Sequence, residues 1–218
     1  MYKGKEINLC IPTLNRYDLL TKCVLSAVNG TVKPTQILII DNGCKLERPN
    51  IENLHVYNFG KNIGVAASWN FFIKNTAEYR IICNDDVDFF EDTIEILLNA
   101  SDENCVAYPG AVPSDNAFSC FVIPDKIVNI VGYFDEKISP NYAYFEDNDY
   151  FRRMNLAGYS TRRVFESRLN HIKSSTLHGF TIQEQNQHHF LFRKARENYI
   201  RKWGGIPGEE RLIIPKTL

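Results

Sequence analysis

The sequence predicts an α/β fold with a mostly parallel central sheet that helices cover on both faces. Short apolar runs alternate along the chain with segments whose apolar residues recur at helical spacing. The runs are apolar throughout, which is typical of strands that are buried on both faces. Polar residues follow several of these runs directly, and parallel strands bring such ends to one edge of the sheet.

The alternation is clearest in the first half of the chain, up to about residue 110. Strands are expected in its apolar runs, at residues 7–11, 37–40, 55–58, 79–83 and 105–109. Helices are expected between them, at about residues 15–30, 65–77 and 93–100. Pro12 is expected to stop the first strand, because proline has no backbone N–H to give to a neighbouring strand.

The second half mixes helices and strands less regularly but is expected to continue the same sheet. Strands are predicted at residues 119–123 and 161–166, and helices at residues 125–132, 146–159 and 183–203. No internal repeat or linker interrupts the chain. One domain over residues 1–218 is therefore expected, with the last helix forming a C-terminal tail over residues 181–218.

Composition restricts the classes of partner and compartment. The chain has 218 residues, 44% of them hydrophobic, which is enough for a core in one domain. Its 25 basic and 26 acidic residues give a net charge of -1, which argues against a nucleic-acid partner. The sequence has no run of about 18 apolar residues, no signal-peptide core and no C-x-x-C pair. A cytoplasmic protein with reduced thiols and no membrane span is expected.

The segment IICNDDVDFFED, residues 81–92, places five carboxylates directly after an apolar run. Asp85, Asp86 and Asp88 provide the oxygen ligands that Mg²⁺ or Mn²⁺ prefers, often together with substrate phosphates. The alternative is a solvated loop. Glu91 and Asp92 are better explained as negative charges that favour the start of the following helix.

Four separated segments together resemble the family-2-type nucleotide-sugar glycosyltransferases of the GT-A fold. In chain order they are IPTLNRYDLLTKCVLSAVNGTVKPTQILIIDNG, KNIGVAASWNFFIKN, NDDVD and GYFDEKI…YFEDNDYFRRMNLAGY. The resemblance covers about residues 5–175. It implies a GT-A (Rossmann-like nucleotide-diphospho-sugar transferase) fold, with a nucleotide-binding half over residues 1–110 and an acceptor and catalytic half over residues 111–180.

The resemblance also implies binding roles for individual residues. Nucleotide binding falls to Pro12, Thr13, Asn15, Arg16, Asp41, Asn62, Gly64, Asn84 and Asp85. Asp41 matches the residue that accepts a hydrogen bond from uracil or thymine, and Asp86 matches the metal-binding aspartate of the D-x-D element. Because Asn84 stands where relatives carry an acid, Asp88 is expected to complete the metal site. His171 is a further candidate ligand for Mn²⁺, with an ordinary surface or core histidine as the alternative.

Inverting glycosyl transfer needs a base that removes the acceptor's hydroxyl proton. The segment Glu146-Asp147-Asn148-Asp149 resembles the acidic element that relatives place at the start of a helix. It implies Asp147 as the base and Glu146 as its neighbour or a ligand of the acceptor. The alternative is that these acids cap the helix or pair with Arg152 or Arg153, and Asp149 is expected to do so.

These observations predict a metal-dependent, inverting glycosyltransferase that uses Mn²⁺ or Mg²⁺. It would move a sugar from a UDP- or dTDP-sugar to a hydroxyl of a glycan acceptor, as a whole protein or as a module of a longer transferase. Residues 171–181 would form a lid over the donor. One alternative is a sugar nucleotidyltransferase, although the N-terminal segment lacks the glycine-rich, basic signature of those enzymes. The other is a non-catalytic glycan- or nucleotide-binding module.

Overall fold

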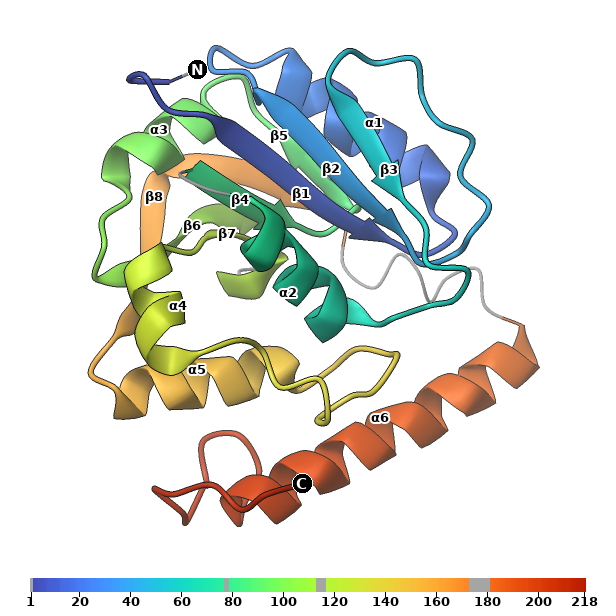
Figure 1. Ribbon diagram of the computed structural model, residues 1–218, viewed down its shortest axis with the longest axis vertical. Helices are drawn as coiled ribbons and strands as arrows, with labels where there is room; N and C mark the ends of the chain where they lie inside the picture. The colour runs from blue at the N-terminus through green and yellow to red at the C-terminus, as the bar shows by residue number, and fades with distance from the viewer. Residues whose placement is uncertain (1, 77–78, 113–116, 173–180) are drawn as a thin grey trace.

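The computed structural model describes residues 2–76, 79–112, 117–172 and 181–218 (Figure 1), so most of the predicted lid lies outside the described residues. The strands are β1 (Ile7–Thr13), β2 (Gln36–Asp41), β3 (Leu54–Tyr57), β4 (Tyr79–Cys83), β5 (Val87–Phe89), β6 (Cys105–Val112), β7 (Cys120–Val122) and β8 (Ser160–His171). The helices are α1 (Tyr17–Val28), α2 (Val65–Asn75), α3 (Thr93–Ala100), α4 (Asp125–Val131), α5 (Glu146–Leu156) and α6 (Ile182–Trp203), with a 3₁₀ turn at Ala117–Ser119.

All of these strands join one sheet in the order β3-β2-β1-β4-β7-β6-β8-β5. The first four strands in this order run parallel, and β6 runs parallel to β8. Antiparallel pairs join β7 to β4 and β6, and β5 to β8. The predicted mostly parallel sheet is therefore observed, and its antiparallel pairs all involve strands that follow β4 in the chain.

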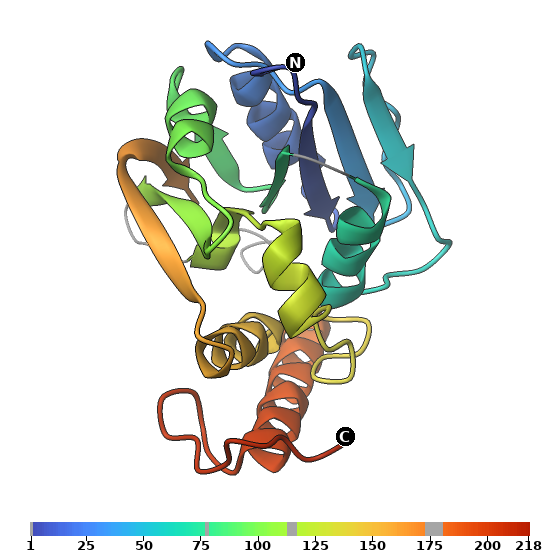
Figure 2. The same cartoon turned by 60° about the vertical axis from the view of Figure 1, so that its left-hand side comes forward.

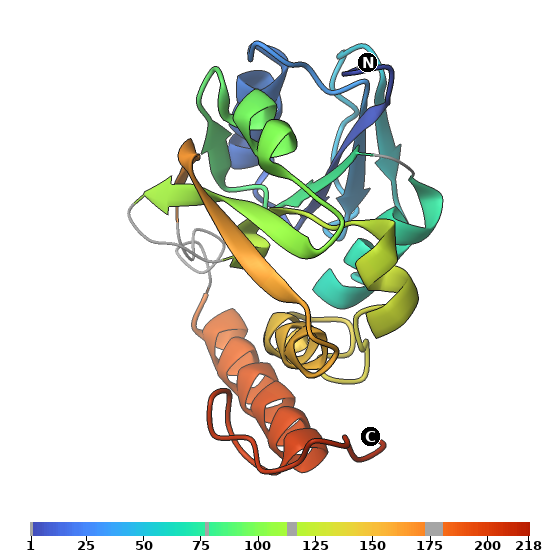
Figure 3. The same cartoon turned by 90° about the vertical axis from the view of Figure 1, so that its left-hand side faces the viewer.

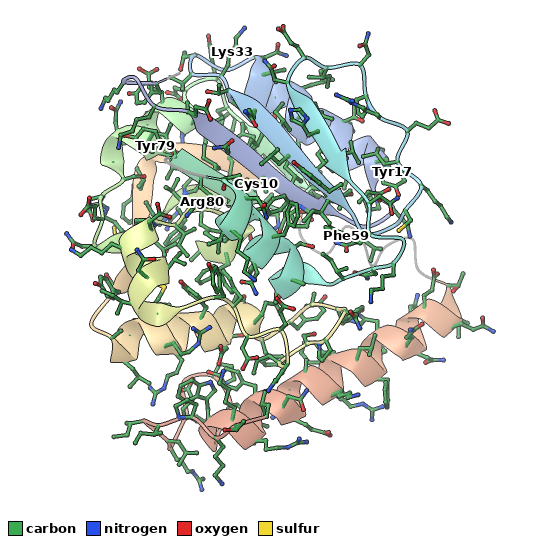
Figure 4. The ribbon with its side chains drawn as sticks, viewed as in Figure 1. Cys10, Tyr17, Lys33, Phe59, Tyr79 and Arg80 are labelled. Atoms are coloured by element: carbon green, nitrogen blue, oxygen red, sulfur yellow. The ribbon has the colours of Figure 1, made fainter. Side chains whose placement is uncertain are left out.

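Helices cover both faces of the sheet, as the apolar strands predicted (Figure 1). Alternate residues of each strand point to opposite faces. In β1, Leu9 packs on the face covered by α1 and α3, whereas Cys10 packs on the face covered by α2, α4 and α5. Figure 4 marks Cys10 in the middle of β1 and Arg80 beside it on β4. Arg80 is 2% exposed and crosses to α4, where it pairs with Asp125 at 2.8 Å.

Four strand predictions need correction. β6 does not end at residue 109 but continues to Val112, because it resumes its pairing with β8 after a register shift at Pro109. β1 does not stop at Pro12 but continues to Thr13, because β4 pairs with it only as far as Cys10 and leaves one side free of hydrogen bonds. β5 lies inside the acidic segment, where the sequence predicts no strand, and it is held by pairing with residues 169–171. β8 runs to His171 rather than ending at residue 166. The sequence does not predict the full length of β8, because many of its residues are polar and exposed and the strand has no continuous apolar run.

The tail helix α6 runs beneath α5, away from the sheet (Figures 2 and 3). It begins with a capping box between Thr181 and Glu184. Its last turn is anchored by Asp149, which is fully buried and contacts Lys202 at 2.6 Å, Trp203 Nε1 at 2.9 Å and Arg153 at 2.9 Å. Asp149 is expected to pair with Arg152, three residues later, but it pairs with Arg153, four residues later, while Arg152 donates to the Leu212 carbonyl. None of the described helices has the length and apolar composition needed to cross a membrane.

Candidate active site

A cavity of about 430 Å³ opens where the carboxyl ends of β1 and β4 meet α2 and α5. The wall is assembled from seven segments that are far apart in the sequence. They are the end of β1 (Pro12, Thr13, Leu14), the turn after β2 (Asn42), the first turns of α2 and the residues before it (Asn62, Gly64, Val65, Trp69), the acidic turn (Asn84, Asp85, Asp86), the residues before β7 (Phe118, Ser119), the start of α5 and the residues before it (Tyr142, Ala143, Tyr144, Glu146, Asp147), and the end of β8 (His171).

This lining contains most of the residues singled out from the sequence, but not all of them. Four lie outside it: Asn15, Arg16, Asp41 and Asp88. Asp88 is an exposed residue of β5, opposite Asn170. Arg16 pairs with Asp18 at 3.3 Å. Among the carboxylates of the acidic turn, the cavity therefore brings together Asp85 and Asp86 but not Asp88.

Asp41 is buried, and its carboxylate accepts hydrogen bonds from other groups of the protein. It is 1% exposed, and its carboxylate accepts hydrogen bonds from the Tyr17 hydroxyl at 2.8 Å and from the backbone N–H groups of Gly43 at 3.0 Å and Leu46 at 2.8 Å. Tyr17, labelled in Figure 4, holds this turn to the start of α1. The contact of Asp41 with a nucleotide base stays a prediction from the resemblance. The neighbouring Asn42 is the residue of this turn that lines the cavity.

The acidic turn combines a hydrogen-bonded carboxylate with one that faces an imidazole. Asp85 accepts a hydrogen bond from the Thr13 hydroxyl at 2.6 Å. Burial raises the pKa of Asp85 to about 7, and the nearby charge of Asp86 adds to the rise while the Thr13 bond opposes it. Asp86 Oδ1 lies 3.2 Å from His171 Nε2, and the two side chains are 8% and 7% exposed. β5 and β8 set this geometry by pairing Val87 with His171.

Asp86 and His171 fit a divalent cation by chemistry. Carboxylate and imidazole are both ligands that Mn²⁺ accepts, and Nδ1 of His171 has no hydrogen-bond partner within the described part of the chain. That part contains no group of three or more histidine, cysteine, aspartate or glutamate side chains arranged to hold a metal. A cation here would take its remaining ligands from a substrate or from water, as Mg²⁺-type sites at phosphates commonly do.

The start of α5 is strained and carries two adjacent acids, of which Glu146 is buried and Asp147 is partly exposed. Tyr144 and Phe145 both have left-handed backbone angles, with φ of 87° and 69°, and such strain in residues other than glycine tends to cluster at functional sites. Glu146 is 4% exposed. Burial, together with the charge of Asp147, raises the pKa of Glu146 to about 8. Burial also raises the pKa of Asp147, whose carboxylate accepts a hydrogen bond from the Asn148 N–H at 2.8 Å.

Gly64 fixes how closely α2 and the residues before α5 approach each other. It has a φ of +83°, and a Cβ atom there would lie 2.6 Å from the Tyr142 N and 2.7 Å from its O. The next residue, Val65, donates its N–H to the Tyr142 carbonyl at 2.7 Å. Only glycine fits this contact, so Gly64 shapes the wall of the cavity rather than offering a side chain to it.

Several lining residues escape sequence reasoning. Phe118, Ser119 and Tyr142 lie in none of the quoted segments, and Trp69 lies in the segment KNIGVAASWNFFIKN, but the resemblance assigns it no role. The α6 helix contributes indirectly, since His188 Nδ1 lies 2.6 Å from the Tyr142 hydroxyl. The left-handed residues before α5 mark this part of the site in the structure, but backbone angles cannot be read from sequence.

Solved structures define the class of fold. A mannosyltransferase from Pyrobaculum calidifontis, solved with GDP-mannose and Mn²⁺, matches with a TM-score of 0.62 and 11% identity, covering 93% of this chain and 66% of that one. The structure of GalNAc-T7 with UDP, GalNAc and Mn²⁺ matches with a TM-score of 0.58 and 11% identity, covering 90% of this chain and 50% of that one. The predicted GT-A fold is thus confirmed.

The sequence itself matches glycosyl transferase family 2 over residues 9–195, and the chain belongs to that family. An uncharacterised glycosyltransferase of Rickettsia conorii is 33% identical over 111 residues, and one of Rickettsia felis is 32% identical over the same length. In each case the match covers 45% of this chain and 18% of the relative. The chain therefore matches less than a fifth of the length of these curated relatives.

Proposed function

We propose that this chain transfers a sugar from a nucleoside-diphosphate sugar to a hydroxyl of a glycan acceptor, with inversion at the anomeric carbon. The single observation that carries the proposal is that one cavity is lined by both the acidic turn and the acids of α5. The family membership supports glycosyl transfer over the nucleotidyltransferase alternative. A UDP- or dTDP-sugar is the donor that the sequence resemblance favours.

Asp147 is the proposed base. Burial raises the pKa of both acids, that of Glu146 to about 8. We assign the one proton of the pair at neutral pH to Glu146, which leaves Asp147 as the anion that can act as base. Asp147 accepts the proton of the acceptor hydroxyl while that oxygen bonds to the anomeric carbon and the bond to the diphosphate breaks. One displacement with one base accounts for inversion.

Asp86 and His171 are the proposed protein ligands of Mn²⁺ or Mg²⁺. A bound cation would stabilise negative charge on the departing diphosphate. Asp85, which accepts a hydrogen bond from Thr13, lines the same cavity as Asn62 and Asn84, and these three residues are proposed to contact the nucleotide. These assignments follow the sequence resemblance for Asp86 and draw on the 3.2 Å contact for His171.

A donor panel tests the proposal. Purified protein is incubated with UDP-, dTDP- and GDP-sugars, with Mn²⁺ or with chelator, and release of the nucleoside diphosphate is measured. Asp147→Asn should lower transfer by about a hundredfold or more while nucleotide binding is retained. Asp92→Asn, an exposed residue before α3 whose side chain makes no capping bond, is the matched control and should keep wild-type activity.

Two outcomes of this panel contradict parts of the proposal. Unchanged transfer by Asp147→Asn would remove that residue from the role of base. Metal-independent behaviour with every donor, or no release from any of them, would contradict metal-dependent transfer. Nucleotide binding without release would instead support the non-catalytic binding module.

A further inference from the structure

Three buried polar atoms in the cavity wall have unused hydrogen-bonding capacity. Trp69 Nε1, Ser119 Oγ and Glu146 Oε2 have no hydrogen-bond partner among the residues that the structure describes. The three residues are 3%, 1% and 4% exposed, and each of them lines the cavity. Buried polar groups are nearly always paired because leaving one unpaired destabilises the folded state. Three such atoms around one cavity indicate that a ligand supplies the partners.

Their chemistry is that of a site for hydroxyl groups. The indole N–H of Trp69 can only donate, the Ser119 hydroxyl can donate or accept, and the Glu146 carboxyl can do either according to its proton. A sugar hydroxyl both donates and accepts, so it complements each of the three. The Trp69 and Phe118 rings lie 6.2 Å apart with an angle of 28° between their planes. They add apolar surface suited to the C–H groups of a pyranose ring.

The position of these atoms points to the sugar of the donor. The Ser119 carbonyl accepts the N–H of Asn84 at 2.8 Å, which places Ser119 directly against the acidic turn. Glu146 is the neighbour of the proposed base Asp147. The sugar being transferred must lie between the diphosphate and the base, and this stretch of wall joins the two.

We propose that Trp69, Ser119 and Glu146 form the subsite that recognises the hydroxyl groups of the donor's transferred sugar. This inference rests on the proposed function and names what selects the sugar within it. It carries a consequence for stability as well as for binding, since the polar atoms of Trp69 and Ser119 destabilise the free protein and gain partners only when the donor binds.

Ser119→Ala is the sharpest test, because it removes one hydroxyl and little volume. Its kcat/KM for the best donor of the panel should fall by about five- to tenfold, the effect expected for one lost hydrogen bond. The dissociation constant of the parent nucleoside diphosphate should not change. The melting temperature of the free variant should equal or exceed that of the wild type. Trp69→Phe should repeat the pattern in kcat/KM, although its smaller ring lowers stability by loosening packing.

Deoxy donors identify the contact. The 3-, 4- and 6-deoxy forms of the same donor are compared with the parent sugar for the wild type and for each variant. The wild type should discriminate against at least one deoxy form, and Ser119→Ala or Trp69→Phe should lose that discrimination at its own position. A positional loss of this kind cannot arise from general destabilisation.

Ser167→Ala is the matched control. Ser167 is a fully buried serine outside the cavity, and its hydroxyl donates to the Thr93 carbonyl at 2.8 Å. This variant should melt at a lower temperature than the wild type while its preference among the deoxy donors stays unchanged. Ser119→Ala should therefore lose selectivity without losing stability, whereas Ser167→Ala should lose stability without losing selectivity.

Several outcomes would overturn the inference. Unchanged discrimination by both Ser119→Ala and Trp69→Phe, or an effect confined to the KM of the acceptor, would remove the donor sugar from this subsite while leaving the proposed transferase intact. A lowered melting temperature for Ser119→Ala would show that its hydroxyl already has a partner in the free protein. Failure of the wild type to bind any sugar nucleotide would overturn both the inference and the proposed function.

Discussion

The surroundings of individual carboxyl groups in this cavity raise their pKa values, and hydrogen bonds oppose the rise to different extents. Burial raises the pKa of Asp85 to about 7 and that of Glu146 to about 8. Thr13 opposes the rise for Asp85 by donating a hydrogen bond that favours the charged form. Glu146 Oε2 has no such partner in the described residues, so its charged form is the less favourable of the two.

The raised pKa of Glu146 makes stability depend on pH. Between its ordinary value of 4.5 and about 8, the folded protein keeps a proton that the unfolded chain has lost. Unfolding then releases a proton, so the free energy of unfolding falls as pH rises through this window and levels off above it. Glu146→Gln cannot ionise. Its free energy of unfolding should fall less between pH 5 and 8.5 than that of the wild type, by on the order of 1 kcal/mol or more.

Urea denaturation at the two pH values, in the presence of a chelator, measures this difference. Glu103→Gln changes an exposed glutamate just before β6 and should keep the wild-type slope with pH. Equal slopes for Glu146→Gln and the wild type would mean that Glu146 is ionised in the folded protein at neutral pH, and the assignment of proton states to Glu146 and Asp147 would have to be reversed.

Among the elements, the contact between α2 and the residues before α5 is the most demanding sterically. Gly64→Ala would place a methyl group 2.6 Å from the Tyr142 backbone and would also strain a backbone with φ of +83°. The wall of the cavity must then shift. We expect a loss of about 2–4 kcal/mol in the free energy of unfolding and weaker donor binding, from strain and displaced packing together.

Gly60→Ala separates the effect of backbone strain from the effect of displaced packing. Gly60 also has a positive φ, +69°, but a Cβ atom there would meet nothing within 4 Å. It should lose only about 1 kcal/mol, from the backbone conformation alone, and should keep wild-type donor affinity. Denaturant unfolding and calorimetric donor binding measure both variants. Equal effects for the two glycines would show that the approach of Tyr142 does not matter to the site.

The elements also show which parts of the fold can be predicted from sequence. The sequence predicts α3 (Thr93–Ala100) and β4 (Tyr79–Cys83) at their observed limits, because apolar periodicity and burial agree there. It does not predict β5, since the three residues of that strand pair only with β8, about 80 residues later. It also misses the end of β1, because nothing in the sequence reveals that β4 stops short of Pro12.

The residues of the site also divide into those that the sequence predicts and those that only the fold brings together. Asp86 and Asp147 can be found from sequence because acids at a strand end and at a helix start form short motifs. Trp69 and Ser119 are predicted only as residues of a helix and a strand, and they line the cavity because α2 and the residues before β7 meet the acidic turn. Asp41 and Asp88 fit the motif pattern, but the structure turns one into an internal hydrogen-bond acceptor and leaves the other exposed on β5.

At the scale of the whole molecule, the cavity is lined by the ends of strands of the sheet and by residues of the helices α2 and α5. The acidic turn follows β4 and His171 ends β8, while the acids of α5 come from the layer below (Figure 1). Asp86 and His171 lie 3.2 Å apart, and among the described residues no third histidine, cysteine, aspartate or glutamate completes a metal-binding group with them. A cation bound by two protein groups is weakly held until the phosphates of a nucleotide complete its coordination.

Nucleotide and cation should therefore stabilise the protein cooperatively. Mn²⁺ alone and nucleoside diphosphate alone should each raise the melting temperature only slightly. Together, at about a hundred times the dissociation constant of the complex, they should add about 2.7 kcal/mol to the free energy of unfolding. Asp86→Asn should abolish the cooperative part, and Asp92→Asn, exposed before α3, should retain it. Thermal unfolding across a matrix of the two ligands measures the effect, and purely additive shifts in the wild type would contradict a shared site.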